Sequence, residues 1–385
     1  MMKRTLGWLM LTAGILSMSS CIKDEEANKE CDIQKAWIEG DEFKKYFTDA
    51  NQMRKDNVSS SESEIVFTVR SLISLPKQLP LFLEVTPKAT VEPASGTPQD
   101  FTQGPVVYTV TSEDGQWKRQ YTVKFQEASL PVFKFGFEHV ANSEKTTGGS
   151  IYNEFYEVDS KGERLNIWAS GNAGASLTLV YKQPDAFPTY SVSEGHTGKA
   201  LCLQTISAGE FGVALKKPIA AGTLFLGKFI VENVITNTLK TTRFGIPIDR
   251  EPVRVTGWYK YKPGEKFTNK DMQETAGKVD QAHIYGVLYK NKDAEGKELY
   301  LYGDDVLTNA NIVKKAEVAA LPATDEWTRF EMFFEGQDID PTMLKNRDYN
   351  LTIVFSSSKD GASFEGAIGS VLLVDDVEVS FLEVQ

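Results

Sequence analysis

Residues 254–262 of this chain (RVTGWYKYK) hold the densest group of side chains that could bind a sugar. Flat aromatic faces stack on the C–H surfaces of sugars, and planar polar side chains take the hydroxyl groups. Alternation along a strand puts Trp258 and Lys260 on one face and Tyr259 and Tyr261 on the other. We expect one pair to lie in the core and the other to line a cleft.

Three residues elsewhere in the chain could share that cleft. Trp168 stands beside glycine and amide residues in WASGN, and Tyr285 belongs to the aromatic strand HIYGVLY. Arg243 lies in a loop beside a strand. Aromatic residues of strands more often fill a core than bind a ligand. The predicted substrate-binding set is Trp168, Arg243, Trp258, Lys260 and Tyr285.

Acidic residues offer a second chemistry, the hydrolysis of a glycosidic bond. That reaction uses two carboxyl groups, about 5 Å apart when configuration is retained and about 6.5–9.5 Å apart when it is inverted. Spacing along the chain determines neither distance, and most acids of a β-sandwich keep its surface solvated. The catalytic residues therefore stay unassigned among the candidates Glu138, Glu154, Glu157, Asp304, Asp305 and Glu331.

Other catalytic signatures are missing from the sequence. It contains no HExxH, GxSxG, Walker or dinucleotide-binding glycine motif. Its three histidines, His139, His196 and His283, lack metal-ligand spacing. The net charge of -11, without a basic cluster, argues against a nucleic-acid partner.

The elements that must position these residues predict an all-β protein. From Phe133 to the end, many strand candidates and almost no helical pattern favour two packed antiparallel sheets of jelly-roll type. Phe133–Phe137 opens this sandwich and Val371–Phe381 closes it, and Ser176–Tyr181 is another predicted strand. Asp375 and its neighbour in the closing strand should point to opposite faces.

Residues 62–127 have the pattern of a smaller β-sandwich, with short strands separated by turns. Val106–Thr111 and Trp117–Phe125 should form a hairpin through an Asp-Gly turn. The run VVYTVTSEDGQWKRQYTVKF resembles the immunoglobulin-like modules at the N-terminus of many Bacteroidetes surface lipoproteins. We assign residues 36–128 to an immunoglobulin-like β-sandwich and 131–385 to a jelly-roll carbohydrate-binding-like domain.

Residues 1–20 have the composition of a secretory signal peptide, in which Lys3 and Arg4 precede an apolar run. Small residues then precede Cys21, which resembles a bacterial lipoprotein site and implies a lipid on Cys21 and a tether over 21–35. The acidic run that follows resembles the surface-export signal of Bacteroidetes lipoproteins, and implies an outer-membrane protein exposed on the cell surface. The alternatives are an ordinary signal peptide and a plain solvated linker.

Glu138, Asp375 and Asp376 raise the question of a metal. An acid after the opening strand and acids in the closing strand resemble the structural calcium site of many carbohydrate-binding jelly rolls. Calcium takes several oxygen ligands, so these acids are a partial signature, and the alternative is that they are exposed or hydrogen-bonded. Structural calcium is the only cofactor that the residues suggest.

The C-terminal part resembles the putative carbohydrate metabolism domain family of Bacteroidetes lipoproteins. The resemblance is carried by GTLFLGKF (222–229), PVRVTGWYKYKPGE (252–265), AHIYGVLYKN (282–291), DEWTRFEMFF (325–334) and SSSKDGASFEGAIGSVLLVDDVEV (356–379). It implies a jelly-roll sandwich with a sugar-binding pocket on its concave face and a part in glycan handling.

The leading hypothesis is a lipid-anchored surface protein that binds an oligosaccharide or polysaccharide in this pocket, with other surface glycan-utilisation proteins as further candidate partners. A glycoside hydrolase with a carboxylate pair in the same pocket is the main alternative, and the residues leave open whether the chain is an enzyme. A structural or adhesive surface protein without a small ligand is the third hypothesis.

Overall fold

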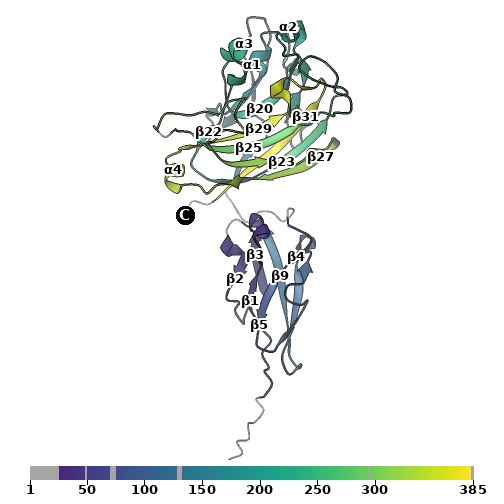
Figure 1. The fold of residues 1–385 in the computed structure, drawn as a ribbon, viewed down its shortest axis with the longest axis vertical. Coiled ribbons are helices and arrows are strands. Elements are labelled where there is room, and N and C mark those ends of the chain that lie inside the picture. The colour runs from purple at the N-terminus through teal and green to yellow at the C-terminus, as the bar shows by residue number, and fades with distance from the viewer. Residues whose placement is uncertain (1–25, 48–49, 70–74, 128–131, 294, 383–385) are drawn as a thin grey trace, which may run out of the picture. The chain divides into compact units, whose positions relative to one another are not determined.

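The computed structural model describes residues 26–47, 50–69, 75–127, 132–293 and 295–382. The chain forms two compact units, one ending at Glu127 and the other beginning at Ala128. Strands dominate both units and the helices are short (Figure 1). The expected all-β fold, with a smaller immunoglobulin-like sandwich followed by a larger jelly-roll sandwich, is confirmed. The predicted signal peptide and Cys21 lie outside the described residues.

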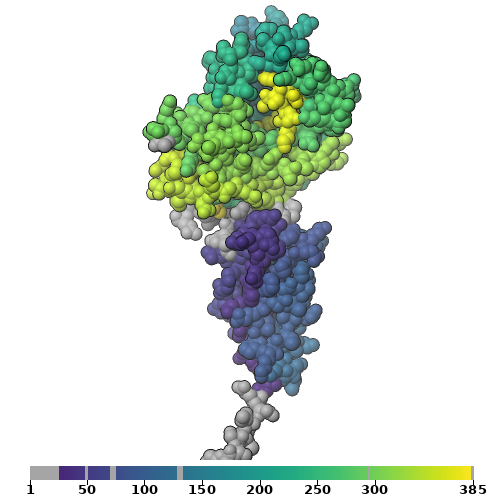
Figure 2. Space-filling view, viewed as in Figure 1, coloured from purple at the N-terminus to yellow at the C-terminus, as the bar shows by residue number. Residues whose placement is uncertain are grey.

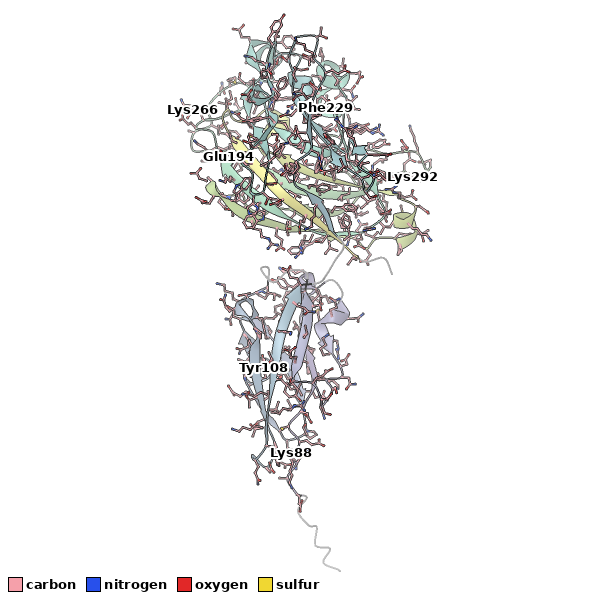
Figure 3. All side chains as sticks on the ribbon, turned by 180° about the vertical axis from the view of Figure 1, so that it is seen from behind. Lys88, Tyr108, Glu194, Phe229, Lys266 and Lys292 are labelled. Atoms are coloured by element: carbon pink, nitrogen blue, oxygen red, sulfur yellow. The ribbon has the colours of Figure 1, made fainter. Side chains whose placement is uncertain are left out.

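The first unit packs two larger sheets and the short β4-β7 pair around one core. One sheet has the order β2-β1-β5 and the other the order β3-β9-β8-β6. The hairpin predicted from the Asp-Gly turn is confirmed, because β8 and β9 pair antiparallel. Tyr108 of β8 lies inside this core, fully buried (Figure 3). The strands are β1 (Ile33–Trp37), β2 (Arg54–Lys55), β3 (Glu64–Val69), β4 (Leu79–Pro80), β5 (Phe82–Val85), β6 (Thr90–Glu92), β7 (Pro98–Gln99), β8 (Val106–Thr111) and β9 (Lys118–Glu127).

The first strand begins inside the range that we assigned to the tether. Ile33 and Ala36 of β1 are fully buried in the core of the first unit. The hydroxyl of Tyr121 donates a hydrogen bond of 2.9 Å to Asp32, which ties the chain just before the strand. Because β1 begins at Ile33, the tether is shorter than 21–35.

The second unit consists of a six-stranded and an eight-stranded sheet, packed face to face around the largest core of the chain. The six-stranded sheet contains β16 (Thr189–Val192), β17 (Ala200–Gln204), β31 (Val371–Phe381), β23 (Pro252–Lys262), β27 (Thr324–Phe333) and β10 (Val132–Phe135). The eight-stranded sheet contains β15 (Trp168–Ser170), β20 (Thr223–Phe229), β29 (Tyr349–Ser356), β25 (His283–Lys290), β26 (Ile312–Glu317), β28 (Glu335–Gly336), β21 (Thr242–Phe244) and β22 (Ile246–Ile248).

Short elements connect and cover these sheets. Strand pairs outside them are β11 (Val140–Asn142) with β12 (Asn153–Phe155), β13 (Glu157–Val158) with β14 (Arg164–Leu165), β18 (Ile206–Ser207) with β19 (Ile219–Ala220), and β24 (Phe267–Thr268) with β30 (Gly366–Ala367). The α-helices are α1 (Asn172–Ala175), α2 (Gly209–Ala214), α3 (Asn233–Thr236) and α4 (Pro341–Lys345). The 3-10 helices of the second unit are η4 (Pro184–Ala186), η5 (Thr238–Lys240) and η6 (Gly361–Ser363), and those of the first unit are η1 (Asp41–Tyr46), η2 (Ala50–Met53) and η3 (Phe101–Gln103).

The opening and closing strands of the second unit lie side by side. β10 pairs antiparallel with β31, with Phe133 opposite Val379. β31 also pairs with β17 and β23, so the last strand of the chain holds the middle of its sheet. The expected strand at Ser176–Tyr181 is wrong, because this segment follows α1 as a turn and irregular backbone. The buried amide of Asn172 holds the start of this helix, since it donates to the carbonyl of Thr189 at 2.6 Å and accepts from its N–H at 3.1 Å.

A buried carboxylate joins three segments at one end of the second unit. Asp280 is 2% exposed. Its Oδ2 accepts hydrogen bonds from the hydroxyl of Ser358 at 2.5 Å, from the hydroxyl of Ser370 at 2.7 Å and from the N–H of Ala367 at 2.8 Å. A buried charge is tolerated only when it is hydrogen-bonded in this way, so Asp280 fixes the path of the chain between β29 and β31.

We expect Asp280→Ala to lower the free energy of unfolding of the second unit by about 3 kcal/mol, because three buried donors lose their acceptor. Urea denaturation measures the change. The control is Asp338→Ala, an exposed carboxylate in the same unit, which should stay within about 0.5 kcal/mol of wild type. Equal losses in the two variants would contradict a structural role for Asp280.

Candidate functional site

The two neighbouring acids of β31 do not point to opposite faces. Gly257 of β23 stands opposite two residues of β31, which makes a β-bulge at Asp376, where φ is 45°. The core face of β31 therefore continues through Val374 and Val377, and both carboxylates fall on the outer side. The expectation of opposite faces is wrong because the bulge adds one residue to the alternation.

Both carboxylates bind the same loop, which lies between β16 and β17. Asp375 is fully buried, and its Oδ2 accepts the N–H of Thr197 at 2.9 Å. Asp376 accepts the hydroxyl of Thr197 at 2.8 Å and lies 2.7 Å from Nδ1 of His196. Glu138 holds the other end of the loop by accepting the N–H of Lys199 at 2.9 Å. The three acids thus fasten one loop to the sheet.

This donor set does not fit the calcium site that the sequence suggested. Calcium needs oxygen ligands that face it together, whereas the carboxylates of Glu138 and Asp375 face N–H groups. Among the described residues, no group of three or more His, Cys, Asp or Glu side chains gathers as it would around a metal ion. Hydrogen bonding to the loop is the role that the geometry gives these acids.

Trp258 and Lys260 lie on the outer face of the six-stranded sheet, both half-buried. The ring of His196 stacks on Trp258, with centroids 4.2 Å apart and planes 12° apart. The Nζ of Lys260 lies 5.3 Å from the ring centre of Trp327. One face of Trp258 is therefore covered by the protein's own loop, and Tyr259 and Tyr261 are the pair that lies in the core.

The other three residues of the predicted pocket lie elsewhere. Trp168 is 7% exposed and packs on Phe135 at 5.1 Å inside the core, so it is not a binding residue. The guanidinium of Arg243 lies over the ring of Tyr300 at 3.2 Å. Tyr285 points to the outer face of the eight-stranded sheet. The structure does not bring the five residues together in one pocket.

A large cavity lies on the outer face of the eight-stranded sheet, with a volume of about 490 Å³. Its floor consists of alternate residues of three neighbouring strands, which point away from the core: Thr223, Phe225 and Phe229 of β20, His283 and Tyr285 of β25, and Val354 and Ser356 of β29. Its walls include residues of α1, α2 and α3 and of the segments around them. In Figure 2, atoms from late in the chain (yellow) emerge there between teal and green atoms of earlier segments.

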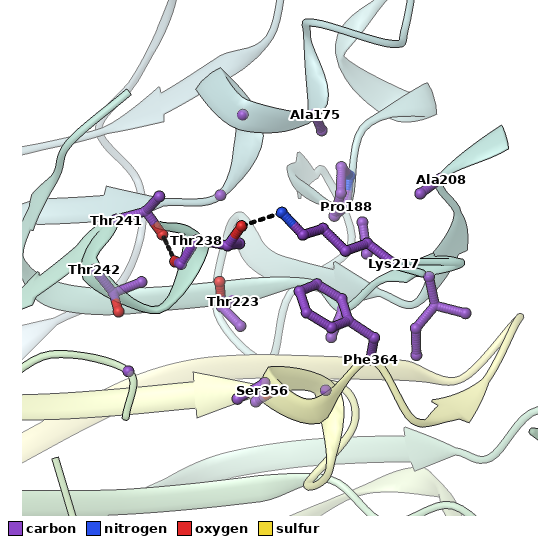
Figure 4. Close-up of a pocket in the computed structure, with 18 of the residues that line it drawn as sticks. Ala175, Pro188, Ala208, Lys217, Thr223, Thr238, Thr241, Thr242, Ser356 and Phe364 are labelled. Carbon is purple, nitrogen blue, oxygen red and sulfur yellow. Dashed lines mark hydrogen bonds between the residues drawn. The ribbon is translucent and has the colours of Figure 1, made fainter. Parts of the chain in front are cut away.

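The charged groups of this cavity are few. Lys217 reaches across it and donates to the hydroxyl of Thr238, near the ring of Phe364 (Figure 4). On the floor, Nε2 of His283 lies 3.0 Å from Oε1 of Glu317, which Lys359 also contacts at 3.0 Å. Burial lowers the pKa of His283, so its imidazole is neutral near pH 7 although Glu317 opposes this shift.

The acids considered for hydrolysis do not meet in this cavity. Asp360 is the only carboxylate among the described lining residues, and its Oδ2 lies 2.7 Å from Nζ of Lys278. The six candidate acids are used elsewhere: Glu138 holds Lys199, Glu154 pairs with Arg164, Glu157 accepts from Trp168, Asp304 pairs with Lys240, Asp305 accepts from Tyr302, and Glu331 pairs with Arg254.

Comparison with known proteins places this sandwich in a family. The profile of the family described as "Putative carbohydrate metabolism domain" matches residues 136–380. A crystal structure from Bacteroides thetaiotaomicron, described as a putative glycoside hydrolase, is 36% identical over 94% of this chain and 99% of its own, with a TM-score of 0.61. The chain belongs to this family.

A second member of known structure, from Bacteroides vulgatus and also described as a putative glycoside hydrolase, is 37% identical to the chain. It covers 65% of this chain and 98% of its own length, with a TM-score of 0.60.

The first unit matches the profile described as "SGBP, N-terminal" over residues 46–125. The search of curated proteins found no match to the chain itself. In the part of the chain that the structure describes, no helix has the length and hydropathy of a membrane span.

The sequence of the chain did not predict most of the residues that line the cavity. Its apolar floor has one signal, because β20 (TLFLGKF), β25 (HIYGVLYK) and β29 (YNLTIVFS) are apolar or buried at nearly every position. A strand with apolar residues on both faces must be covered on both. That pattern indicates a second apolar surface outside the core, although it does not identify the segments that cover it.

The pH dependence of stability tests how the loop is held. Burial raises the pKa of Asp375, although the backbone N–H groups of Thr197, Asp376 and His196 oppose this shift. The folded chain then binds this proton more tightly than the unfolded chain, so the free energy of unfolding falls as pH rises from about 4 through the raised pKa. We expect Asp375→Asn to lack this decrease. The free energy of unfolding of the variant, measured by urea denaturation, should therefore rise relative to that of wild type between about pH 3 and pH 7. The opposite trend would mean that the hydrogen bonds outweigh burial.

Proposed function

We propose that the chain binds a carbohydrate ligand in the cavity on the outer face of the eight-stranded sheet. The observation that carries the proposal is this cavity, whose lining includes the accessible aromatic side chains of Phe211, Phe229 and Phe364. Ligand sites are commonly concave, aromatic-lined volumes of about 300–1,000 Å³. The description of the family as a carbohydrate metabolism domain supports a sugar as the ligand.

Binding fits the cavity better than hydrolysis does. Both common mechanisms of glycoside hydrolysis need two carboxyl groups on either side of the bond. The described lining has one, Asp360, and Lys278 already neutralises it. Hydrolysis remains the second candidate function, because two family members carry the description of a putative glycoside hydrolase.

The location of the protein belongs to the same proposal. The sequence before residue 26 supports a signal peptide and a lipid on Cys21, which would hold the chain on the outer membrane with both units outside the cell. At that place the protein would meet extracellular glycans before they enter the cell, together with other surface proteins of glycan utilisation.

Blocking the cavity should abolish sugar binding. Ala175 lines the cavity, and Ala175→Trp puts a large ring into it. We expect this variant to lose at least about tenfold in affinity for any glycan that wild type retains on an affinity gel or array. Trp258→Ala, on the other sheet, is the matched aromatic control and should bind as wild type does. If Trp258→Ala loses binding and Ala175→Trp keeps it, the proposed site is wrong.

An assay for reducing sugar separates the two candidate functions. We expect wild type to release no reducing sugar from a glycan that it binds, because the cavity lacks a carboxylate pair. Turnover that disappears in Asp360→Asn but persists in Asp338→Asn would instead make Asp360 a catalytic residue. That result would favour the hydrolase.

A further inference from the structure

The lining of the cavity has few of the planar polar side chains that usually take sugar hydroxyls. Among its described lining residues, none is Asn, Gln, Arg, Glu or Trp. An unsubstituted sugar carries a hydroxyl on most carbons, and each hydroxyl buried without a partner costs about 1–3 kcal/mol. Of the polar side chains on the floor, His283 faces Glu317 and Ser356 donates to the carbonyl of Ser358. The depth of the cavity therefore offers few free partners to a bare sugar ring and is suited to an apolar group.

The opening of the cavity is apolar as well. Large apolar residues of the lining are open to solvent, among them Phe211 at 56%, Ile235 at 65% and Leu177 at 50% exposure. Clustered exposed apolar side chains on a soluble unit mark an interaction site more often than single ones do. Here they continue into an apolar volume, as expected where an apolar ligand enters.

Charged groups of the lining are restricted to a few places. Most of the Ser and Thr hydroxyls that line the cavity already donate to protein oxygens, among them Thr178, Thr238, Thr241, Ser356 and Ser358. Lys359 and Asp360 lie on the loop after β29, and their side chains are 48% and 41% exposed. Lys217 lies across the cavity and donates to Thr238. Among the described residues, none forms a salt bridge with Lys217. A ligand can thus find charged partners beside Lys359 and Asp360 at the opening and at Lys217 across the cavity, while its remainder lies among mostly apolar atoms.

We infer that the ligand of this cavity is an amphiphilic carbohydrate, a sugar that carries an alkyl or acyl chain. The alkyl or acyl chain lies in the cavity, against Phe211, Phe229 and Phe364, and the sugar stays at the opening beside Lys359 and Asp360. The inference rests on the proposed carbohydrate binding and adds the class of ligand. Its energetic basis is the burial of CH₂ groups, each of which tightens binding roughly fourfold.

Alkyl β-D-glucosides below their micelle concentrations are suitable probes. Calorimetric titration of the full chain should give an affinity that rises roughly fourfold per CH₂, or more than about tenfold from hexyl to octyl glucoside. Glucose should show no binding at the same concentrations. Octanol should bind more weakly than octyl glucoside, because it lacks the sugar.

Two exposed lining residues give variants that keep the fold. Phe211→Ser and Ile235→Ser should each weaken binding of octyl glucoside several-fold, since each removes apolar contact at the opening. Val279→Ser is the matched control, because Val279 is 64% exposed and does not line the cavity. Unchanged thermal transitions show that all three variants are folded.

Three results would overturn the inference, and they are distinguishable. Affinity that does not depend on chain length, together with glycan binding that Ala175→Trp abolishes, would refute the amphiphile and leave the proposed function standing. Octanol binding as tightly as octyl glucoside, with no glycan bound, would refute both and leave a lipid site. Equal loss in Val279→Ser and the two cavity variants would show that the effect is not local.

Discussion

The second unit depends on the pairing of one strand, β31, with three others. β31 lies between β17 and β23 and also accepts β10, so the last strand of the chain joins residues from both ends of the domain. Such pairing requires an uninterrupted core face, and the bulge at Asp376 keeps Val374 and Val377 on that face. The bulge places the carboxylates of Asp375 and Asp376 together on the outer side of the sheet, where Thr197 of the loop donates a hydrogen bond to each. The loop in turn covers Trp258 through His196, which removes that ring face from use as a sugar platform.

The eight-stranded sheet faces a different constraint, because it is apolar on both sides. Its inner face meets the other sheet, but its outer face also carries Phe225, Tyr285, Val287 and Val354. Part of this outer face is closed by Leu301 and Val306 from a neighbouring segment. The rest is roofed by short helices that do not fill the space, which leaves the cavity. The cavity is therefore the part of a two-sided apolar sheet that the chain leaves uncovered.

Reasoning from the sequence succeeded where the signal was local. Alternation and an Asp-Gly turn predicted the β8–β9 hairpin, and alternation alone predicted that either the tryptophan or the tyrosine face of β23 is core. Prediction from the sequence failed where a contact between residues distant in the sequence overrides the local preference for a strand. Ser176–Tyr181 has the residue types of a strand, but the buried amide of Asn172 holds the chain in a helical turn before it. The cavity could not be predicted because its lining comes from segments separated by up to nearly the length of the domain.

The distribution of charge around the cavity favours a ligand with two unlike ends. His283 could have placed a charge on the floor, but burial lowers its pKa and keeps the imidazole neutral. Glu317 pairs with Lys359 and Asp360 pairs with Lys278 at the solvent side, and the ammonium of Lys217 donates to Thr238 across the cavity. A bare glycan would need polar partners throughout its buried surface, and a pure hydrocarbon would leave the polar side of the opening unused. A sugar needs polar partners for its hydroxyl groups, whereas an alkyl or acyl chain is buried best among apolar atoms. A cavity with charged groups at its opening and a mostly apolar interior can bind both parts of one amphiphilic molecule.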